Sequence, residues 1–273
     1  MIEISVIIPL YNAENTITAT LDSVRNQIGN FCFEIFIIND ASTDKSNEIV
    51  EKYKIENQNL NIKILQLESN KGVSVVRNIG LKNATKDYIA FLDADDCWFP
   101  EKTKQQMAFF IEKYPKIDGI ACCRNNETVG FPYRVNPKTN LASISLKKML
   151  IRNICPTPTV ILKKEIIDNI GLFNEDMRHA EDSNYWLRIS EKYNLFILDK
   201  SLVTTGGGKK SFGVSGLSAD LTEMEKGFQK NLKEMYHSNR INWVEYFLFF
   251  IFAKIKYFSR PLRLLFLKNN TNG

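Results

Sequence analysis

Apolar runs of strand length alternate with helix-like segments through the first half of this 273-residue chain. The predicted strands cover residues 4–10, 32–38, 62–67 and 88–92, of which 62–67 also contains Lys63 and Gln66, and the residues between them show the apolar spacing of helices. Short apolar runs bounded by polar residues are typical of buried strands. Because strands alternate with helices, the pattern predicts an α/β fold, with helices on both faces of an at least partly parallel central sheet.

The second half of the chain is less regular. Residues 124–143 include several asparagine, glycine and proline residues and therefore predict a long loop. Further strands are expected at 117–122, 159–162, 195–198 and 202–205. Further helices are expected at 101–114, 164–170, 181–193 and 219–236.

The run at 88–92 stops at a cluster of carboxylates, Asp93, Asp95 and Asp96. Carboxylates this close repel one another, and burying them without a partner is costly. A divalent cation that also binds a phosphorylated ligand would neutralise them, and ligands of open α/β sheets bind beyond the carboxyl ends of the strands. The alternative is that Asp95 or Asp96 caps the helix that Pro100 opens. The cluster alone supports both interpretations.

Polar residues also end the other predicted strands. Residues 9–12, 39–40 and 69–71 each close or follow an apolar run. If the strands are parallel, these segments and the acidic cluster meet at one edge of the sheet. Several polar segments at one edge predict a ligand-binding site there.

The composition is that of an ordinary globular protein, with 44% hydrophobic and 25% charged residues. The net charge is +5, but basic residues without acids gather in the tail, and the rest of the chain is close to neutral. Nucleic acid is therefore not expected as a partner. The basic residues of the tail are Lys254, Lys256, Arg260, Arg263 and Lys268.

The cysteines, 5 in all, show no spacing typical of a zinc site or a redox pair. Free thiols favour a reducing compartment. The N-terminal residues enter a strand at once and lack the pattern of a signal peptide. We therefore expect a cytoplasmic protein.

Residues 243–258 are rich in large apolar side chains and lead into the basic part of the tail. The uninterrupted apolar part is shorter than the roughly 20 residues that a transmembrane helix needs. A helix lying on an anionic membrane would combine both features and would place the protein at the inner face of the plasma membrane. The alternative is a helix packed on the domain, with its basic residues in solvent.

The polar segments, together with a later acidic pair, resemble the motifs of the inverting glycosyltransferases of family 2. These enzymes have the nucleotide-sugar-binding fold called GT-A. The resemblance covers about residues 3–205, and its motifs occur in the order of the family and with similar separations. They are Ser5–Asn12 with Glu14, Ile38–Asp44, Asn70–Ser74 with Arg77, Asn78 and Gly80, Phe91–Asp96, and Glu181–Asp182 with Trp186 and Arg188.

The resemblance implies a donor site at the strand ends. Asp40 would accept a hydrogen bond from the ring N–H of uracil or thymine, or would instead cap the turn before Asp44. Asp93 would hold the ribose. Lys71 and Arg77 would lie near the base or the phosphates, unless they are ordinary surface charges. The other residues implied to bind the nucleotide sugar are Pro9, Leu10, Tyr11, Asn12, Glu14 and Ala94.

The resemblance also implies a division of the chemistry. Asp95 would bind Mn²⁺ or Mg²⁺ beside the departing diphosphate, and Asp96 would support it or cap a helix. Asp182 would act as general base on the acceptor hydroxyl, with Glu181 tuning that base or contacting the acceptor. Trp186 would face the acceptor or belong to the core. The acidic pair could instead cap the helix that follows it.

The expected organisation is a GT-A domain at 1–215 and a C-terminal helical region at 216–273. Within the domain, 1–122 would bind the nucleotide sugar and 123–215 the acceptor. Lys209 and Lys210 lie in a glycine-rich segment that could close on the diphosphate or could simply be a basic loop.

Some positions depart from the family pattern. Asn39 stands where the family often has an acid, and Ala41 replaces a frequent glycine, but Asp40 between them is kept. The Gln-x-x-Arg-Trp pattern of processive members does not follow Asp182. The addition of a single sugar is therefore expected rather than polymer synthesis.

We therefore expect a metal-dependent inverting glycosyltransferase that moves one sugar from a UDP- or dTDP-sugar to a hydroxyl of a glycan or lipid-linked glycan in surface-polysaccharide biosynthesis. A nucleotidyltransferase is one alternative, although it usually has a glycine-rich phosphate loop, which residues 9–12 lack. The other is a non-catalytic sugar-nucleotide-binding module, against which Asp95 and Asp182 together argue.

Overall fold

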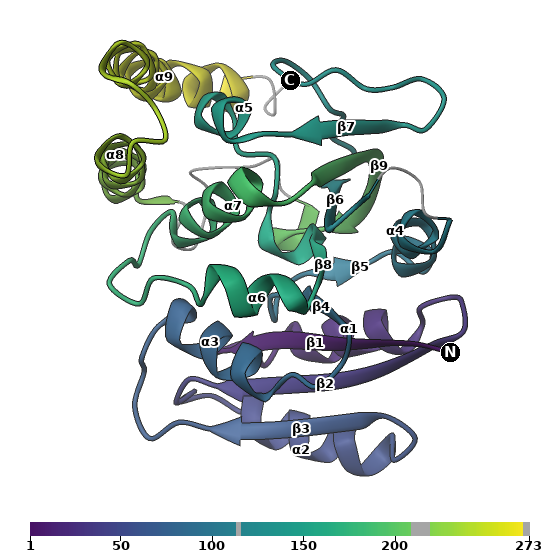
Figure 1. Cartoon of the computed structure of the whole chain (residues 1–273). Coiled ribbons are helices and arrows are strands. Elements are labelled where there is room, and N and C mark those ends of the chain that lie inside the picture. The colour runs from purple at the N-terminus through teal and green to yellow at the C-terminus, as the bar shows by residue number, and fades with distance from the viewer. Residues whose placement is uncertain (113–115, 209–218, 270–273) are drawn as a thin grey trace.

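The computed structural model describes residues 1–112, 116–208 and 219–269. Strands and helices alternate along most of the chain, and the long helix α9 ends it (Figure 1). The strands are β1 Ile2–Leu10, β2 Phe31–Asn39, β3 Asn61–Gln66, β4 Tyr88–Phe91, β5 Cys97–Trp98, β6 Gly119–Arg124, β7 Leu141–Ile144, β8 Ile161–Lys163 and β9 Leu195–Thr204. The α-helices are α1 Ile17–Arg25, α2 Ser46–Glu56, α3 Val73–Asn83, α4 Lys102–Ile111, α5 Leu146–Ile151, α6 Glu165–Ile170, α7 Glu181–Lys192, α8 Leu221–His237 and α9 Trp243–Asn269. Short 3₁₀ helices lie at η1 Thr157–Thr159 and η2 Gly206–Gly208.

One mixed sheet joins the described strands in the order β3-β2-β1-β4-β8-β6-β9-β5, and β7 pairs with β9. The strands β3, β2, β1 and β4 are parallel to one another. β8 runs antiparallel to both β4 and β6, and β6 is parallel to β9. The predicted α/β class, with a mixed central sheet flanked by helices, is therefore confirmed.

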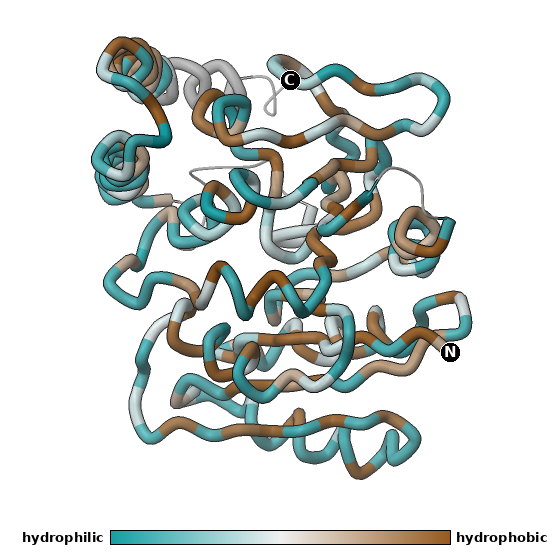
Figure 2. Tube along the Cα trace, in the orientation of Figure 1, coloured by the Kyte–Doolittle hydropathy of each residue, from teal (hydrophilic) through white to brown (hydrophobic). Residues whose placement is uncertain are grey.

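Both faces of β1, β2 and β4 are largely buried, because different helices cover each face, whereas the edge strand β3 is mostly exposed or half-buried. In β1, Ile4, Val6 and Ile8 belong to one hydrophobic cluster, which includes side chains of α1, α2 and α4. Ile7 of the same strand belongs to a second cluster, with side chains of α3 and α7. Figure 2 shows hydrophobic residues along the central strands. Burial on both faces explains why the sequence shows continuous apolar runs there rather than alternation.

The structure differs from the prediction around β9. A single strand of 10 residues replaces the two short strands expected at 195–198 and 202–205. Its first half pairs with β7 and its last residues pair with β5, while β6 runs along its other edge. Pairing on both sides of its polar middle keeps the strand continuous, although the register with β6 shifts at Asp199 and Lys200, and local propensity does not predict this extended conformation.

Several short elements were not expected from the sequence. β5 consists of Cys97 and Trp98, and β7 lies at the end of the segment that predicts a loop. Both strands are bonded to β9, so their extended conformation depends on a partner far away in the sequence. Helix α5, which follows β7 almost directly, was also missed.

The C-terminal helices pack on the domain. Leu232 of α8 belongs to the hydrophobic cluster that contains α7. The rings of Tyr236 and Tyr246 lie 5.0 Å apart where α8 meets α9. Lys256 of α9 donates a hydrogen bond of 2.9 Å to the carbonyl oxygen of Ile151, at the end of α5. Within the described part of the chain, we find no helix long and apolar enough to cross a membrane.

A buried carboxylate ties the parallel strands together at their amino-terminal side. Glu34 of β2 is 2% exposed and accepts a hydrogen bond of 2.8 Å from the Ser5 hydroxyl. It also accepts from the amide of Thr85 at 3.0 Å and from the ammonium of Lys63 at 2.7 Å. Burial alone would raise the pKa of Glu34, but these bonds lower it to about 2.

We expect Glu34→Gln to lower the free energy of unfolding at about pH 7 by about 2 kcal/mol. The neutral amide oxygen is a weaker acceptor than the carboxylate, and the amide N–H₂ group would face the donors that now bond to Glu34, so those hydrogen bonds would be lost. A carboxyl with a lowered pKa in the folded state stabilises the fold above its ordinary pKa of 4.5. This contribution is lost as the pH falls toward the folded pKa. The difference between variant and wild type should therefore shrink as the pH falls from about 5 to about 2, which chemical denaturation measures.

Glu3→Gln is the matched control. Glu3 lies on β1 and pairs with Lys86, but its side chain is 49% exposed. An exposed ion pair contributes little, so this variant should stay within about 0.5 kcal/mol of wild type. Equal losses in both variants would contradict the role given to Glu34, as would a loss that does not change with pH.

Candidate active site

The carboxyl ends of the parallel strands lie at one edge of the sheet. Leu10, the last residue of β1, is paired with Asn39 of β2, and Asn39 is paired with Gln66 of β3. Ile7 of β1 is paired with Phe91, the last residue of β4. The polar segments that follow these strands therefore start side by side, as the sequence predicts. We call this edge of the sheet the rim.

Reciprocal hydrogen bonds fasten the loop after β1 to the loop after β2. Asn12, in the left-handed region with φ 47°, accepts a bond of 2.8 Å from the amide of Thr43. Glu14 accepts a bond of 3.0 Å from the amide of Lys45. The amide of Glu14 in turn donates to the Asp44 carboxylate at 3.0 Å. Asn12 and Glu14, both expected at the nucleotide pocket, therefore fix the shape of the rim.

The other residues expected at the pocket differ in exposure. Pro9 is half-buried, and Tyr11 is 50% exposed. The side chains of Leu10 and Ala94 are buried in the core, so these residues reach the rim through their backbone. The carbonyl of Ala94 accepts a hydrogen bond of 2.9 Å from the hydroxyl of Thr20 in α1.

Asp40 closes the loop that leads into α3. It is 4% exposed and accepts hydrogen bonds from the amides of Lys71 at 2.7 Å and Gly72 at 2.9 Å. The alternative that Asp40 caps the turn before Asp44 is wrong, because its carboxylate bonds to residues 71 and 72, and Asn39 accepts the bond from the Ser42 amide in that turn, at 3.0 Å. Each oxygen of Asp40 keeps a second acceptor position. The side chain of Lys71 is exposed beside it.

The acidic cluster forms a turn at the end of β4. The amide of Asp96 donates to the carbonyl of Asp93 at 3.0 Å, which leaves Asp95 at the tip. Although the Asp95 side chain reaches the surface, partial desolvation and the charge of Asp93 raise its pKa. A cation bound at this turn would relieve that repulsion.

Asp96 does not cap a helix. It is 5% exposed and accepts a hydrogen bond of 2.9 Å from the amide of Gly206, just after β9. Helix α4 begins only at Lys102, and the side chain that accepts a bond from its first turn is Gln27, from the Thr103 amide at 2.9 Å. Burial, together with the charges of Asp93 and Asp95, raises the pKa of Asp96 to about 8. The cap interpretation is wrong because β5, which the sequence does not reveal, separates the acidic turn from α4.

Arg77 of α3 joins the rim to the start of α7. It is 4% exposed, and its guanidinium donates to Asp93 at 2.9 Å and to Glu181 at 3.0 Å. Burial would lower the pKa of Arg77, but the charges of Asp93, Glu181 and Asp182 raise it. The expected contact with a base or phosphate does not fit this geometry, because carboxylates occupy both ends of the guanidinium. The surface-charge alternative is wrong as well, since the side chain is buried.

Glu181 and Asp182 open α7 directly after Ala180, which has a left-handed φ of 56°. Burial and the neighbouring Asp182 raise the pKa of Glu181 to about 7, against the opposing charge of Arg77. Burial also raises the pKa of Asp182, although Arg77 and a 2.6 Å bond from the Ser183 amide oppose the rise. Carboxyls with raised pKa values beside a buried cation can accept a proton near neutral pH.

Sequence reasoning gave no role to the residues that hold the loop before α7 in place; Ser74 and Asn78 were named only as parts of a family motif, and Asn231 was not singled out. Asn78 of α3 donates to the carbonyl of Phe173 at 2.9 Å and accepts from its amide at 2.8 Å. The Ser74 hydroxyl donates to a carbonyl of the same loop at 3.1 Å. Asn231 of α8 donates to the carbonyl of Ala180 at 2.9 Å. The presence of polar residues on the apolar face of the predicted helix α3 could have indicated a structural role for Ser74 and Asn78. No comparable pattern in the sequence indicates the role of Asn231.

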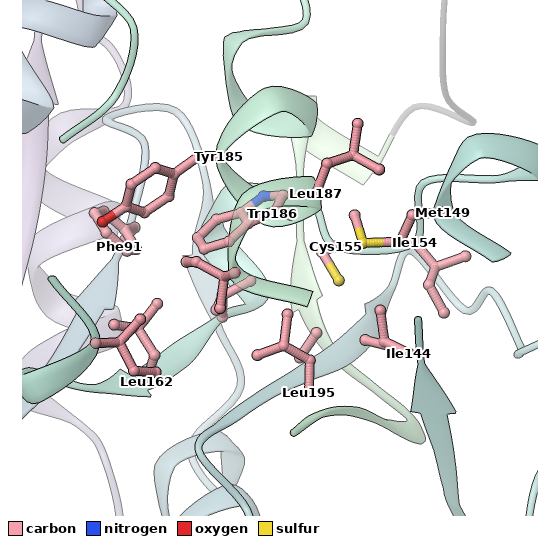
Figure 3. Close-up of a cluster of buried hydrophobic side chains, with 14 of the residues drawn as sticks. Phe91, Ile144, Met149, Ile154, Cys155, Leu162, Tyr185, Trp186, Leu187 and Leu195 are labelled. Carbon is pink, nitrogen blue, oxygen red and sulfur yellow. The ribbon is translucent and has the colours of Figure 1, made fainter. Parts of the chain in front are cut away.

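Trp186 lies in the core rather than at an acceptor site. Its side chain is 0% exposed, and its ring meets Phe91 of β4 edge to face, with centroids 5.9 Å apart (Figure 3). It meets Phe173 in the same way at 6.2 Å. The expectation that Trp186 contacts an acceptor is therefore wrong. Its ring instead packs α7 against β4.

A metal ion at the rim would depend on the substrate for most of its ligands. The described residues contain no group of 3 or more His, Cys, Asp or Glu side chains that could hold a metal. Mg²⁺, however, is often held by one or two carboxylates together with substrate phosphates. Asp95, exposed and repelled by Asp93, fits that arrangement.

Some expectations fall on segments without a described placement. Lys209, Lys210 and the boundary expected between 215 and 216 lie outside the described residues. The division expected between 122 and 123 falls inside β6, so the two halves share the same sheet.

A family model described as glycosyl transferase family 2 matches residues 5–171, which include the rim. TarS of Staphylococcus aureus strain Mu50, a poly(ribitol-phosphate) beta-N-acetylglucosaminyltransferase, is 32% identical over 193 residues, which are 69% of this chain and 32% of TarS. TuaG of Bacillus subtilis strain 168, a putative teichuronic acid biosynthesis glycosyltransferase, is 31% identical over 192 residues, which are 69% of this chain and 72% of TuaG. The match thus spans about a third of the length of the first relative and most of the second.

Solved structures show the same architecture. The crystal structure of S. aureus TarS 1-349 in complex with UDP-GlcNAc has a TM-score of 0.66 and 26% identity, covering 86% of this chain and 66% of that one. The mannosyltransferase PcManGT from Pyrobaculum calidifontis, solved with GDP-Man and Mn²⁺, has a TM-score of 0.63 and 18% identity, covering 88% and 64%, and shows the fold alone. The fold is thus the GT-A fold, and the chain belongs to glycosyl transferase family 2.

Proposed function

We propose that this protein is a metal-dependent inverting glycosyltransferase that transfers a single sugar from a UDP- or dTDP-sugar to a hydroxyl of a glycan or lipid-linked glycan. The observation that carries the proposal is the contact of Arg77 with both Asp93 and Glu181. It brings the acids of the rim and those of α7 into one site, where donor and acceptor would meet. Family membership favours this function over nucleotidyl transfer.

The donor would lie across the rim. Asp40 would accept a bond from the ring N–H of the base through a remaining acceptor position, and Asp93 would hold the ribose. Tyr11 and Lys71 are exposed at the same edge and would face the base or the diphosphate. A relative with a similar fold, TarS, was crystallised with UDP-GlcNAc, which supports a UDP-sugar. The wall of the pocket would consist of Pro9, Leu10, Asn12, Glu14 and Ala94.

Asp95 would hold Mn²⁺ or Mg²⁺ together with the donor diphosphate. When bound, such an ion neutralises the charge that develops on the departing nucleoside diphosphate. The protein contributes the position of the carboxylate, at the exposed tip of the turn that starts at Asp93. The buried bond between Asp96 and Gly206 holds the base of that turn in place.

Asp182 would remove the proton from the acceptor hydroxyl while its oxygen attacks the anomeric carbon. The new bond forms on the face opposite the departing diphosphate, so an α-linked donor gives a β-linked product. The raised pKa of Asp182 makes it a stronger base than an ordinary aspartate. Arg77 opposes that rise and so favours the ionised form that can take the proton. Glu181 would tune this base or contact the acceptor.

The acceptor would be a surface glycan, free or lipid-linked, met at the cytoplasmic face of the plasma membrane. The support is the similarity to relatives whose names specify poly(ribitol-phosphate) and teichuronic acid biosynthesis. Because the sequence lacks the motif of processive members after Asp182, the product would carry a single added sugar.

Asp182→Asn should lower kcat by about 100-fold or more and leave donor affinity nearly unchanged, because the amide cannot take up the proton. Release of UDP from UDP-sugars, with and without added glycan acceptors, measures the rate. Asp168→Asn, an exposed acid on α6, is the control and should match wild type. A normal rate in Asp182→Asn would exclude this residue as the base. A wild type that binds donors but never releases UDP would indicate a non-catalytic module.

Asp95→Asn tests the metal. UDP with Mn²⁺ should raise the Tm of the wild type further than UDP alone, because a ligand that binds only the folded state stabilises it. The variant should keep the effect of UDP and lose the increment due to Mn²⁺. Asp87→Asn, an exposed acid just before β4, should behave as wild type. An unchanged Mn²⁺ increment in Asp95→Asn would remove Asp95 from the metal site.

Arg77→Met should destabilise the fold by about 3 kcal/mol, since it leaves buried carboxylates without their cation. It should also shift the acidic limb of the pH dependence of kcat. Arg77 lowers the pKa of Asp182, so its removal raises that pKa, and activity should appear only at higher pH than in wild type. Arg77→Lys, which keeps the charge, should retain the wild-type limb. Identical limbs in wild type and Arg77→Met would contradict the electrostatic link.

A further inference from the structure

Helix α9 presents a continuous apolar face to solvent. Every exposed side chain described between 243 and 259 is large and apolar, with 39% to 70% of its surface accessible. At about 100° per residue, these positions fall within about 140° of the helix circumference. We call this set the stripe; it consists of Trp243, Val244, Phe247, Leu248, Ile251, Ile255 and Phe258.

The stripe is not the face that attaches α9 to the domain. Tyr246, Phe249 and Phe250 point to the other side and pack against the hydrophobic cluster that contains α7 and α8. Lys254 falls within the angular range of the stripe, between Trp243 and Phe247, but it is only partly exposed, and its ammonium forms an ion pair of 3.2 Å with Glu225 of α8. The helix is therefore already docked, and the stripe is left for something outside the chain. A contiguous apolar face that is exposed to solvent marks an interaction site.

The charge of α9 indicates what covers the stripe. After Glu245, which pairs with Lys147, the sequence contains no acid but still has basic residues as far as Lys268. Because the sequence after Glu245 is net positive, two copies joined through α9 would each bring a segment of the same charge, which opposes a dimer. An anionic surface would attract the basic residues. Because no described helix can span a membrane, α9 would lie flat in the interface.

We propose that the stripe docks this protein on the surface of an anionic lipid bilayer. Figure 1 shows α9 at the end of the molecule away from β3, next to α8 and α5. Since α8 in turn bonds to Ala180 at the start of α7, docking would bring the acceptor side closest to the bilayer. Given the proposed function, this orientation suits an acceptor that is held in the membrane.

The test uses the full chain with vesicles of phosphatidylcholine, either alone or with about 30% phosphatidylglycerol. Sedimentation should show strong binding to the anionic vesicles, weaker binding to the neutral ones, and release at high salt. Trp243 provides a second measurement, because it is 69% exposed while Trp98 and Trp186 are buried at 4% and 0%. A blue shift of tryptophan emission on anionic vesicles would therefore report entry of the stripe.

The variant Phe247→Ser/Leu248→Ser/Ile255→Ser should lower the vesicle partition coefficient by about 100-fold, at about fivefold for each lost side chain. The control, Ile55→Ser/Ile111→Ser/Phe131→Ser, removes equally exposed apolar residues elsewhere, at 67%, 59% and 79%, and should bind as wild type. Stabilisation by UDP, measured without vesicles, shows that each variant is folded and tests the donor site separately.

Several results would overturn the proposal. Unchanged partition of the stripe variant would do so, as would an equal loss in the control. A wild-type dimer in solution that the stripe variant dissociates, without vesicle binding by the monomer, would assign the stripe to a second copy. If the variant does not fold, the Trp243 emission of wild type decides, since no blue shift on anionic vesicles also contradicts docking.

Discussion

The geometry of the candidate site depends on the buried guanidinium of Arg77. Arg77 would be very costly to place in the interior alone, and it is tolerated because Asp93 and Glu181 each accept a hydrogen bond from it. The residues come from α3, from the turn after β4 and from the start of α7. The same contact that satisfies the guanidinium therefore fixes the distance between the edge of the parallel strands and the acids of α7. In the proposed reaction, the edge of the sheet would bind the donor and the acids of α7 would activate the acceptor, so the two must lie close together.

The topology of the sheet brings these segments close to one another. Its parallel half aligns the ends of β1, β2 and β4, so that loops from separate parts of the chain share one edge. The insertion of antiparallel β8 between β4 and β6 then lets the second half of the chain return across the same sheet. Asp96 bonds the turn after β4 to Gly206 after β9 and so joins the two halves again. Much of the polarity at the rim thus serves to hold loops together, including that of Asn12 and Glu14.

How far the sequence predicts this protein varies with the range of the interactions involved. β1, β2 and β4 were predicted because burial on both faces makes their sequences mostly apolar. The segments of the rim were predicted because polar residues stop those runs. β9 and β5 were misjudged, because they are extended only through pairing with each other and with distant strands. Trp186 carries no local sign of whether its ring faces a ligand or the core, and the packing of Phe91 and Phe173 decides that.

The sequence by itself determined the α/β class, the order of the elements as far as β4 and the position of the acids at strand ends, because these follow from local periodicity and from residues adjacent in the chain. Only the tertiary structure decided which acids share a cation, which are held by backbone amides and which remain at the surface. Arg77 and Glu181 are 104 residues apart, and no local pattern records a hydrogen bond across that distance. The same holds for α9, whose apolar residues are visible in the sequence. Packing on α8 and α5 decides which of them are buried and which form the stripe.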